Sequence, residues 1–417
     1  MTAATAHPAV SHLAATALRR HVRRSGRRRR LAAVGLTLPL VAYLLVFFVL
    51  PILGMLRLSV ANDELATTLP ETTALLRAWS GEGMPPEDVL AVLAREMRAA
   101  HAARTLARLA KRLNVESAGF RTLVLATGRN LPETPAGSWT ETFLALDPEW
   151  GKPAIWGALR RAAAPWTDLY LLAALDLERG EQGEIRRVAP ERAIYLGILG
   201  RTLWISFLVT AACLVLAYPL AYLLAGLPER YANPLLILVL LPFWTSLLVR
   251  SAAWIVLLQR EGPINQILQG LRLVDQPLQL VFNRAGVLIA MTHVLLPFMV
   301  LPLYSVMRNI HPSYVRAAIS LGASPWLAFR RIFLPLSVPG IAAGCLLVFI
   351  LAIGYYITPA LLGGADDQMI SWFVAFFTLQ TVNWGMAAAL GTLLFAVTLA
   401  LYALFARVVG VDRLRLG

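Results

Sequence analysis

The residue types that most often carry chemistry do not form a catalytic pattern in this chain. A nucleotide-binding P-loop requires Gly-Lys followed by Ser or Thr, and the only Gly-Lys pair, Gly151-Lys152, is followed by Pro153. The six His residues lack metal-ligand spacing, no GxSxG elbow occurs, and Cys213 and Cys345 stand alone in apolar runs. The sequence therefore predicts no catalytic residue, no metal site and no cofactor bound by this chain itself.

Residues 316–335, RAAISLGASPWLAFRRIFLP, suit the transmission of mechanical work better than catalysis. They form a basic, helix-favouring segment between two apolar runs of membrane length. Pro312 favours a helix start, small side chains let a partner approach closely, and Pro325 and Pro335 are expected to end the segments. An ordinary basic loop would explain any one residue of this segment, but not a series of residues in this order and spacing. The series comprises Arg316, Ala317, Ala318, Gly322, Ala323, Ile332, Leu334 and Pro335.

Arg250 is the main candidate for a residue that lines a path through the membrane. An ionisable side chain inside a membrane span is costly and marks a functional site by default, although a buried Arg also pairs with backbone carbonyls. His293 lies between prolines in a later apolar run and fits a packing or hinge role. Aromatic rings near Arg250 suit the binding of an amine. The other path candidates are Trp244, Thr245, Ser246, Trp254, Tyr355 and Tyr356, with Asp366 and Asp367 following as groups offered to an outside partner.

The composition places these candidates in a membrane. The chain has 417 residues, 58% of them hydrophobic and 15% charged, with a mean hydropathy of +0.64, which predicts an all-α polytopic membrane protein. A helix needs about 20 apolar residues to cross a bilayer. The sequence predicts six spans, within Leu31–Leu56, Thr202–Pro228, Tyr231–Gln259, Ala285–Met307, Ile332–Ala365 and Gln368–Ala406. In the last stretch, the break at Asn383–Gly385 predicts an interfacial or re-entrant piece before one span.

The net charge of +14 predicts membrane orientation and not nucleic-acid binding, because the Arg residues do not form one face. With the N-terminus in the cytoplasm, the Arg residues of the tail and inner loops outnumber those of the short outer loops. We therefore expect a multi-pass membrane protein with both termini cytoplasmic. The expected order is a basic tail (1–30), a first span (31–56), an extracytoplasmic insert (57–193), a transmembrane core (194–410) with a cytoplasmic loop (309–335), and a C-terminus (411–417).

The insert is a near-neutral, mostly helical module of unknown role. Pro85–Asp88 predicts a helix start, and apolar residues then recur at helical spacing at Val89, Leu93, Met97, Ala100, Leu106, Leu109 and Leu113. One helix through this stretch would carry a basic face that is either solvated or laid on anionic lipid. That face comprises Arg95, Arg98, Arg104, Arg108, Lys111 and Arg112.

The spaced series from Arg316 to Pro335 resembles the cytoplasmic motif of binding-protein-dependent ABC transporter permeases. Further segments, among them Leu241–Arg250 and Tyr355–Gly364, are similar to permeases of the polyamine and opine class. The resemblance covers residues 31–57 and 194–410. It implies a permease core at 194–410 with the type I importer fold, in a bacterial inner membrane. It also implies an ABC ATPase dimer that holds ATP and Mg, a second permease subunit and a periplasmic substrate-binding protein. The family usually has Glu where Arg316 stands.

The resemblance predicts the permease subunit of an ATP-driven importer for polyamines or related amines, opines or amino-acid-like solutes. The alternative is an ion-driven secondary transporter, for which we find neither a carboxylate in a span nor internal symmetry. A membrane-anchored sensor would explain the insert but not the spaced loop. The predicted spans contain no Asp or Glu, which leaves two alternatives. The substrate is a polycation that passes along a permissive aromatic and polar path, or it is a zwitterion or anion that meets Arg250.

Overall fold

The computed structural model describes residues 34–116, 119–180 and 183–409, so the predicted tail (1–30) and C-terminus (411–417) lie outside the described residues. The chain divides into two compact units, Met1–Arg57 and Leu58–Gly417. In the first unit, a helix begins at Val34 and continues through a π-helical turn, η1 (Leu45–Val49), into α2 (Leu50–Leu58). This helix is long and apolar enough to cross a membrane, as predicted for the first span.

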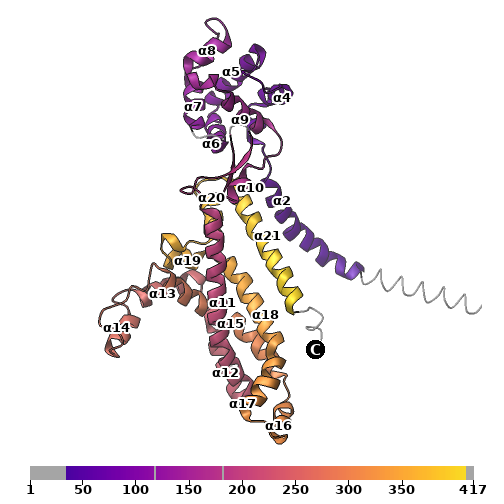
Figure 1. The fold of residues 1–417 in the computed structure, drawn as a ribbon, viewed down its shortest axis with the longest axis vertical. Coiled ribbons are helices and arrows are strands. Elements are labelled where there is room, and N and C mark those ends of the chain that lie inside the picture. The colour runs from indigo at the N-terminus through magenta and orange to yellow at the C-terminus, as the bar shows by residue number, and fades with distance from the viewer. Residues whose placement is uncertain (1–33, 117–118, 181–182, 410–417) are drawn as a thin grey trace, which may run out of the picture. The chain divides into compact units, whose positions relative to one another are not determined.

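The second unit contains the other candidate spans of the described residues (Figure 1). Four further helices are long and apolar enough to cross a bilayer: α11 (Tyr195–Gly226), α15 (Arg284–Arg308), Pro325–Ile353, and α21 (Trp384–Val409), whose apolar stretch runs to Arg407. A bent pair, Glu229–Trp244 and Leu247–Gly270, brings the total among the described residues to six if it counts as one span. The number of predicted spans is therefore confirmed.

The third predicted span is not one straight helix. It comprises α12 (Glu229–Leu240), a 3-10 turn η3 (Leu241–Trp244), α13 (Leu247–Leu258) and α14 (Pro263–Gly270), and the two halves meet at 98°. The break falls at Thr245 and Ser246, whose backbones are extended. Pro242 lies just before the break and lacks the N–H that would continue the helical hydrogen bonds.

Three helices, α11, α15 and α18 (Leu334–Ile353), pack together as the centre of the membrane bundle (Figure 1). Gly340 and Gly344 lie one turn apart on α18. A Cβ atom at Gly340 would lie 3.1 Å from the carbonyl oxygen of Pro302, and one at Gly344 would lie 2.6 Å from Met299 Sδ. This GxxxG spacing lets the backbones of α18 and α15 approach closely, which is how helices gain packing energy without a hydrophobic driving force.

After α18, the chain leaves the bundle through short pieces before the last span. The helix ends at Ile353, and α19 (Ile357–Leu362), a 3-10 turn η5 (Ala365–Asp367) and α20 (Ile370–Leu379) follow. The fifth span is therefore shorter than the predicted stretch to Ala365. The ten-residue α20 is too short to cross a membrane, and the final span begins at Trp384, as the break at Asn383–Gly385 predicted.

The insert is mostly helical, as predicted, and it ends in a small hairpin. Strand β1 (Leu177–Arg179) pairs antiparallel with β2 (Ile185–Arg187). The helices before the hairpin are α3 (Glu64–Thr68), α4 (Pro70–Ala78), α5 (Glu87–Ala102), α6 (Leu106–Glu116), α7 (Phe120–Asn130), α8 (Trp139–Leu146), η2 (Pro148–Gly151), α9 (Pro153–Ala163) and α10 (Leu169–Ala174).

The apolar residues predicted on one helical face of the insert are all buried, but the single long helix is wrong. They lie on α5 and α6, which are separated by a turn in which Arg104 has a φ of 59°. This left-handed backbone ends the first helix and redirects the second. The predicted basic face is divided accordingly: Arg104, Arg108 and Lys111 are exposed, whereas Arg112 is buried.

The last helix of the insert packs on the membrane bundle. Tyr170 of α10 shares a core with Ile198 of α11, Ile370 of α20 and Leu390 of α21. Burial raises the pKa of Tyr170 to about 12, so its phenol is neutral at physiological pH. The Asp176 carboxylate accepts hydrogen bonds from the backbone N–H groups of Tyr195 and Leu196, at distances of 3.0 and 2.8 Å. It thereby caps the start of α11 and ties the hairpin region to a span.

Candidate functional site

The loop predicted to transmit work begins with a short, well-capped helix. Helix α16 (Pro312–Ser320) has Pro312 at its first position, where its missing N–H costs nothing. The His311 side chain caps the helix by accepting a hydrogen bond from the Ser313 backbone N–H, at 3.2 Å. The predicted helix start at Pro312 is confirmed.

Gly322 ends this helix for a backbone reason. Its φ of 92° lies in the left-handed region that favours glycine. The Gly322 N–H donates to the carbonyl of Ile319 at 2.9 Å, and the Ala323 N–H donates to that of Ala318 at 3.0 Å, which is a Schellman motif. A Cβ atom at Gly322 would meet nothing within 4 Å, so the position is open as well as left-handed.

The second half of the loop is continuous with a span. Helix α17 (Pro325–Ala328) leads through the π-helical turn η4 (Phe329–Phe333) into α18, so one helix runs from Pro325 to Ile353. Pro325 therefore starts a helix and Pro335 does not end one, contrary to the sequence expectation. The π turn, in which the Leu334 N–H donates to the carbonyl of Phe329, precedes Pro335 and adapts the helix to its missing donor.

The predicted loop residues do not all face outward. Ala318 is buried, and Ala323, Ile332 and Leu334 are half-buried, so their sizes serve packing within the chain. The exposed ones are Arg316, Ala317, Gly322 and Pro335. Apolar side chains that the sequence analysis did not single out also project from this loop. Tyr314, Ile319, Leu321, Trp326 and Leu327 are exposed, and Leu321 reaches 89%.

Aromatic contacts connect the loop to a second span. The ring of Tyr222, on α11, lies edge-on to Phe329 and Phe333, with ring centroids 5.7 and 5.0 Å away. Phe329 also stacks on Trp326 at 5.6 Å. Sequence reasoning missed this cluster, although Phe329 and Phe333 stand four residues apart and thus share a helical face. Displacement of the loop therefore acts on α11 and α18 together.

Arg308 fixes the same end of the bundle. Its Nη1 donates to the carbonyls of Ala225 and Leu227, each at 3.0 Å, and so joins the end of α15 to the end of α11. A cavity of about 730 Å³ lies beside it, with Arg316 and His311 in its wall. Arg316 thus stands at the edge of a basic hollow between the loop and the span ends.

The structure brings three of the predicted path residues together. Arg250 and Trp254 lie one turn apart on α13, and Trp254 Nε1 donates to His293 Nδ1 of α15 at 3.2 Å. The indole and imidazole rings meet edge-on, with centroids 5.3 Å apart. Arg250 is half-buried, and no described group accepts from its shielded Nε and Nη1. Arg250 thus holds two unpartnered donors near the Trp254 and His293 rings.

Neighbouring hydroxyl groups close this cluster on the side of α19. Ser251 Oγ and Thr358 Oγ1 are both buried and lie 3.1 Å apart. Tyr355, half-buried between α18 and α19, is held by a 2.6 Å hydrogen bond from Ser371 to its carbonyl. Tyr356 beside it is 38% exposed. The two tyrosines therefore stand in the short non-helical link that follows the fifth span.

Other candidates lie elsewhere than the sequence indicated. Trp244, Thr245 and Ser246 do not share a helix with Trp254 but form the break before α13, where Trp244 is 74% exposed. Asp367 is not offered to an outside partner, because it is 7% exposed and accepts from Arg284 at 3.0 Å. Asp366 remains exposed, and its carbonyl accepts from Arg201.

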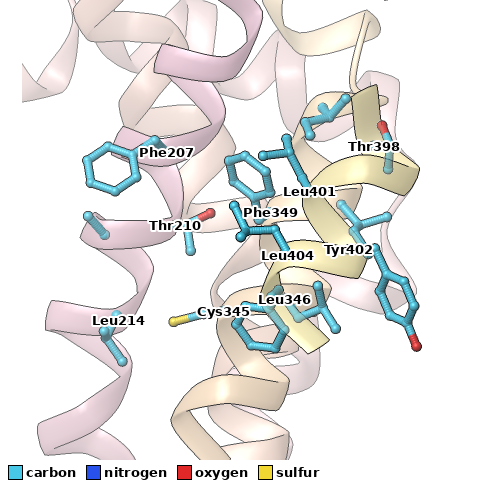
Figure 2. A pocket seen from close by; sticks show the side chains of 14 residues that line it. Phe207, Thr210, Leu214, Cys345, Leu346, Phe349, Thr398, Leu401, Tyr402 and Leu404 are labelled. Carbon is cyan, nitrogen blue, oxygen red and sulfur yellow. The ribbon is translucent and has the colours of Figure 1, made fainter. Parts of the chain in front are cut away.

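A separate apolar cavity of about 580 Å³ lies between α11, α18 and α21 (Figure 2). Phe207, Phe349 and Tyr402 are among its lining residues, and none of the lining residues is charged. The hydroxyls of Thr210 and Thr398 are already bonded to carbonyls one turn back, at 2.8 and 2.7 Å. This cavity offers a solute no polar partner and suits hydrocarbon, so the path candidates remain those around Arg250.

Comparison with known proteins identifies the family. The sequence model described as "Binding-protein-dependent transport system inner membrane component" matches residues 202–413, more than half of the chain. This chain belongs to that family. It is similar to the spermidine/putrescine transport system permease protein PotB of Escherichia coli K12, with 39% identity over 196 residues, covering 47% of this chain and 71% of PotB. PotB of Haemophilus influenzae is 35% identical over 212 residues, covering 50% and 74%.

Two solved transporters are more distant neighbours of this permease. A bacterial ABC transporter for the import of alginate shares 19% identity at a TM-score of 0.45, covering 52% of this chain and 78% of that one. The MetNI methionine ABC transporter shares 15% identity at a TM-score of 0.41, covering 53% and 96%.

Family membership decides several of the predictions. The chain is a multi-pass inner-membrane permease of an ABC importer, and its relatives are permeases and not enzymes. Importers of this kind work with an ATPase and a substrate-binding protein, which are separate subunits. The ion-driven alternative has no support. The family match begins at Thr202, so the insert lies outside it.

Proposed function

We propose that this permease imports polyamines or related small amines, and that residues 309–335 receive the work of an ABC ATPase dimer. The observation that carries the proposal is the continuity of the loop with the bundle. One helix runs from Pro325 to Ile353, and Phe329 and Phe333 contact Tyr222 of α11. A partner that moves the loop as a rigid body would change the packing of two spans at once.

The exposed surface of the loop supports a protein partner. Leu321 and Trp326 are 89% and 68% exposed, although burying such side chains is worth about 2 kcal/mol each. Their neighbour Arg316 replaces the usual Glu of the family, which calls for an acidic or carbonyl group on the ATPase. This permease therefore pairs with a matched ATPase, whose subunits hold the ATP and Mg.

The names of the relatives support an amine as the substrate. PotB proteins, at 35–39% identity, are spermidine/putrescine permeases. The predicted spans contain no Asp or Glu, so a cation passing this chain meets aromatic faces, such as those of Trp254 and Tyr355, by cation–π attraction. The periplasmic binding protein then supplies most of the selectivity. A zwitterionic or anionic solute, met by Arg250, is the alternative that the uptake assay distinguishes.

The remaining partners follow from the arrangement of the importer. A second permease subunit, homologous or identical, completes the path, and the substrate-binding protein docks at the end of the bundle opposite residues 309–335. A count of six spans and the Arg distribution support an arrangement in which both termini and this loop are cytoplasmic and the insert lies outside.

The experiment compares Leu321→Glu with the unchanged permease. Tagged protein is purified in mild detergent, co-purifying proteins are identified by mass spectrometry, ATPase activity is measured, and labelled spermidine uptake is followed in cells. Because the Leu321 side chain is 89% exposed, the variant should still insert in the membrane but lose the ATPase and the uptake. Gly322→Asp should also abolish uptake. Because Asp and Asn strain the left-handed backbone alike, Gly322→Asn is the control that separates the added charge from the strain.

Two results would contradict the proposal. Recovery of the same ATPase and normal uptake with Leu321→Glu would remove the loop from the interface. Uptake that is inhibited by an excess of an unlabelled amino acid or opine, but not by putrescine, would exclude polyamines and favour a zwitterionic or anionic substrate.

A further inference from the structure

The basic side of α6, in the insert, meets the first turn of the last membrane span. Lys111 Nζ donates a hydrogen bond to the backbone carbonyl of Thr381, in the link between α20 and α21. Close by, Gly385 of α21 packs directly on Tyr170, because a Cβ atom there would lie 2.3 Å from the ring. Since α21 begins at Trp384 and crosses the bilayer, these contacts hold α6 at the level of lipid headgroups.

A cavity of about 650 Å³ lies between these elements, and its charges are unevenly distributed. At its rim, Arg108 and Lys111 are exposed beside Trp384. In the deeper wall, Arg112 has a side chain only 3% exposed and pairs with Glu116 at 3.2 Å. Glu64, also in the wall, adds a second carboxylate there. Arg161 also pairs with Glu116, at 3.4 Å, so the two deep cations balance the two carboxylates and the excess positive charge lies at the rim.

Apolar side chains continue the rim away from the insert. Leu379 at the end of α20, Val382 in the link and Trp384 at the start of α21 are 72%, 63% and 54% exposed. Trp at the end of a span is typical of the membrane interface. A surface that is basic on one side and apolar on the other matches a molecule with an anionic head and a hydrocarbon tail.

We propose that the groove between α6 and the start of α21 binds the headgroup of an anionic phospholipid. Arg108 and Lys111 hold the phosphate, and the acyl chains lie along Leu379, Val382 and the outer surface of α21. A soluble anion would use the two cations but leave the apolar rim unexplained, and a zwitterionic lipid would not use the excess charge. The lipid would fasten the insert to the membrane at a point next to its joint with the bundle.

Lipid retention by the full-length protein tests this proposal. The purified permease is exchanged into detergent with phosphatidylglycerol or phosphatidylcholine, and bound lipid is measured by native mass spectrometry. Phosphatidylglycerol should be retained preferentially. A basic residue near an anionic headgroup contributes about fivefold in binding, so Arg108→Gln should lower retention about fivefold and Arg108→Gln with Lys111→Gln about 30-fold.

Matched variants separate charge from folding. Arg108→Lys keeps the charge and should keep the lipid, whereas Arg121→Gln with Arg129→Gln, which neutralises two exposed residues of α7, should change nothing. Arg108→Gln leaves the Lys111 contact with Thr381 intact, so its effect reports the headgroup. Equal retention of both lipids, an equal loss in the α7 control, or complete displacement of the lipid by millimolar inorganic phosphate would overturn the proposal.

Discussion

The insert and the membrane bundle bury their apolar residues in different ways. The insert has a closed core, with Trp150, Trp156, Phe120 and Phe143 almost inaccessible to solvent. In the bundle, burial is concentrated where α11, α15 and α18 meet, while α12, α13 and α21 each leave several large apolar side chains exposed. In water, the insert must bury its apolar side chains against one another within one chain. The outer apolar side chains of the bundle are covered by lipid and other subunits instead.

Polar groups differ between the two regions as well. In the insert, carboxylates from one element cap helices of another: Glu96 accepts from the N–H groups of Glu71 and Thr72, and Glu87 accepts from those of Trp139 and Thr140. In the bundle, hydroxyls such as those of Thr202 and Ser206 bond to carbonyls of their own helix, each at 2.8 Å. Backbone polar groups within a bilayer have no water to bind and are satisfied locally.

The sharpest test of this difference is whether the insert folds without the bundle. We expect residues 58–168 to be soluble and to unfold cooperatively in urea, because their core excludes the bundle. In this fragment, Trp156→Ala should lower the free energy of unfolding by about 3–5 kcal/mol, since Trp156 is fully buried and donates to the carbonyl of Trp150 at 2.7 Å. Trp166→Ala, at an exposed site, is the control. An insoluble fragment would show that the core is not self-sufficient.

A second test concerns the joint between the regions. Gly385→Ala places a methyl group against Tyr170 and should cost about 1–3 kcal/mol of packing energy. Cysteines introduced at Lys111 and Thr381 should then form a disulfide less readily than in the parent, because a displaced Tyr170 moves α6, whose Arg112 lies 5.3 Å from its ring, away from α21. Gly200→Ala on α11 meets nothing within 4 Å and should leave cross-linking unchanged. Equal cross-linking in both variants would mean that Gly385 is not what permits the close approach.

Within the bundle, Phe329→Ala should uncouple ATP hydrolysis from uptake. The substitution removes the ring contacts with Tyr222 and Trp326, each worth about 0.5–1.5 kcal/mol, so we expect uptake per ATP hydrolysed to fall about tenfold. The ATPase should still co-purify, since the exposed surface at Leu321 is unchanged. Phe329→Tyr keeps the ring and should keep the coupling. Loss of the ATPase from Phe329→Ala would assign the residue to the interface instead.

The smallest effect is a pH dependence confined to the insert. Hydrogen bonds from the Thr140 side chain and backbone lower the pKa of Glu87. Its stabilising effect is therefore present above the ordinary pKa of Glu and is lost as the pH falls through the lowered value. The midpoint of urea unfolding for residues 58–168 should decrease less between pH 7 and pH 3 in Glu87→Gln than in the parent. Glu133→Gln, at an exposed site, should behave as the parent does.

Sequence patterns predicted features that depend on local composition. The number of spans, the short piece before the last span, the helix start at Pro312 and the buried face from Val89 to Leu113 all follow from apolar length or spacing, and all are confirmed. The helix ends expected at Pro325 and Pro335 were wrong, and the bend in the third span was not predicted. Proline disfavours the interior of a helix, but its presence in a sequence does not show whether the helix bends there, begins there or continues through a π turn.

The path residues show the same limit. Arg250 was recognisable as a charge within a span, but its proximity to Trp254 and His293 depends on how α13 crosses α15. The GxxxG spacing of Gly340 and Gly344 would have predicted the close approach of α18 to a neighbouring helix. The neighbour itself, α15, is not encoded by any local pattern.

The sequence by itself determined that this chain is a polytopic permease with a basic loop at 309–335 and a helical insert, because hydropathy, charge and motif spacing are local properties of the chain. The tertiary structure decided which groups act together: the aromatic contacts that join the loop to α11, and the lysine that joins the insert to α21. Such contacts form between segments that are distant in sequence, and their partners are fixed only when the helices pack.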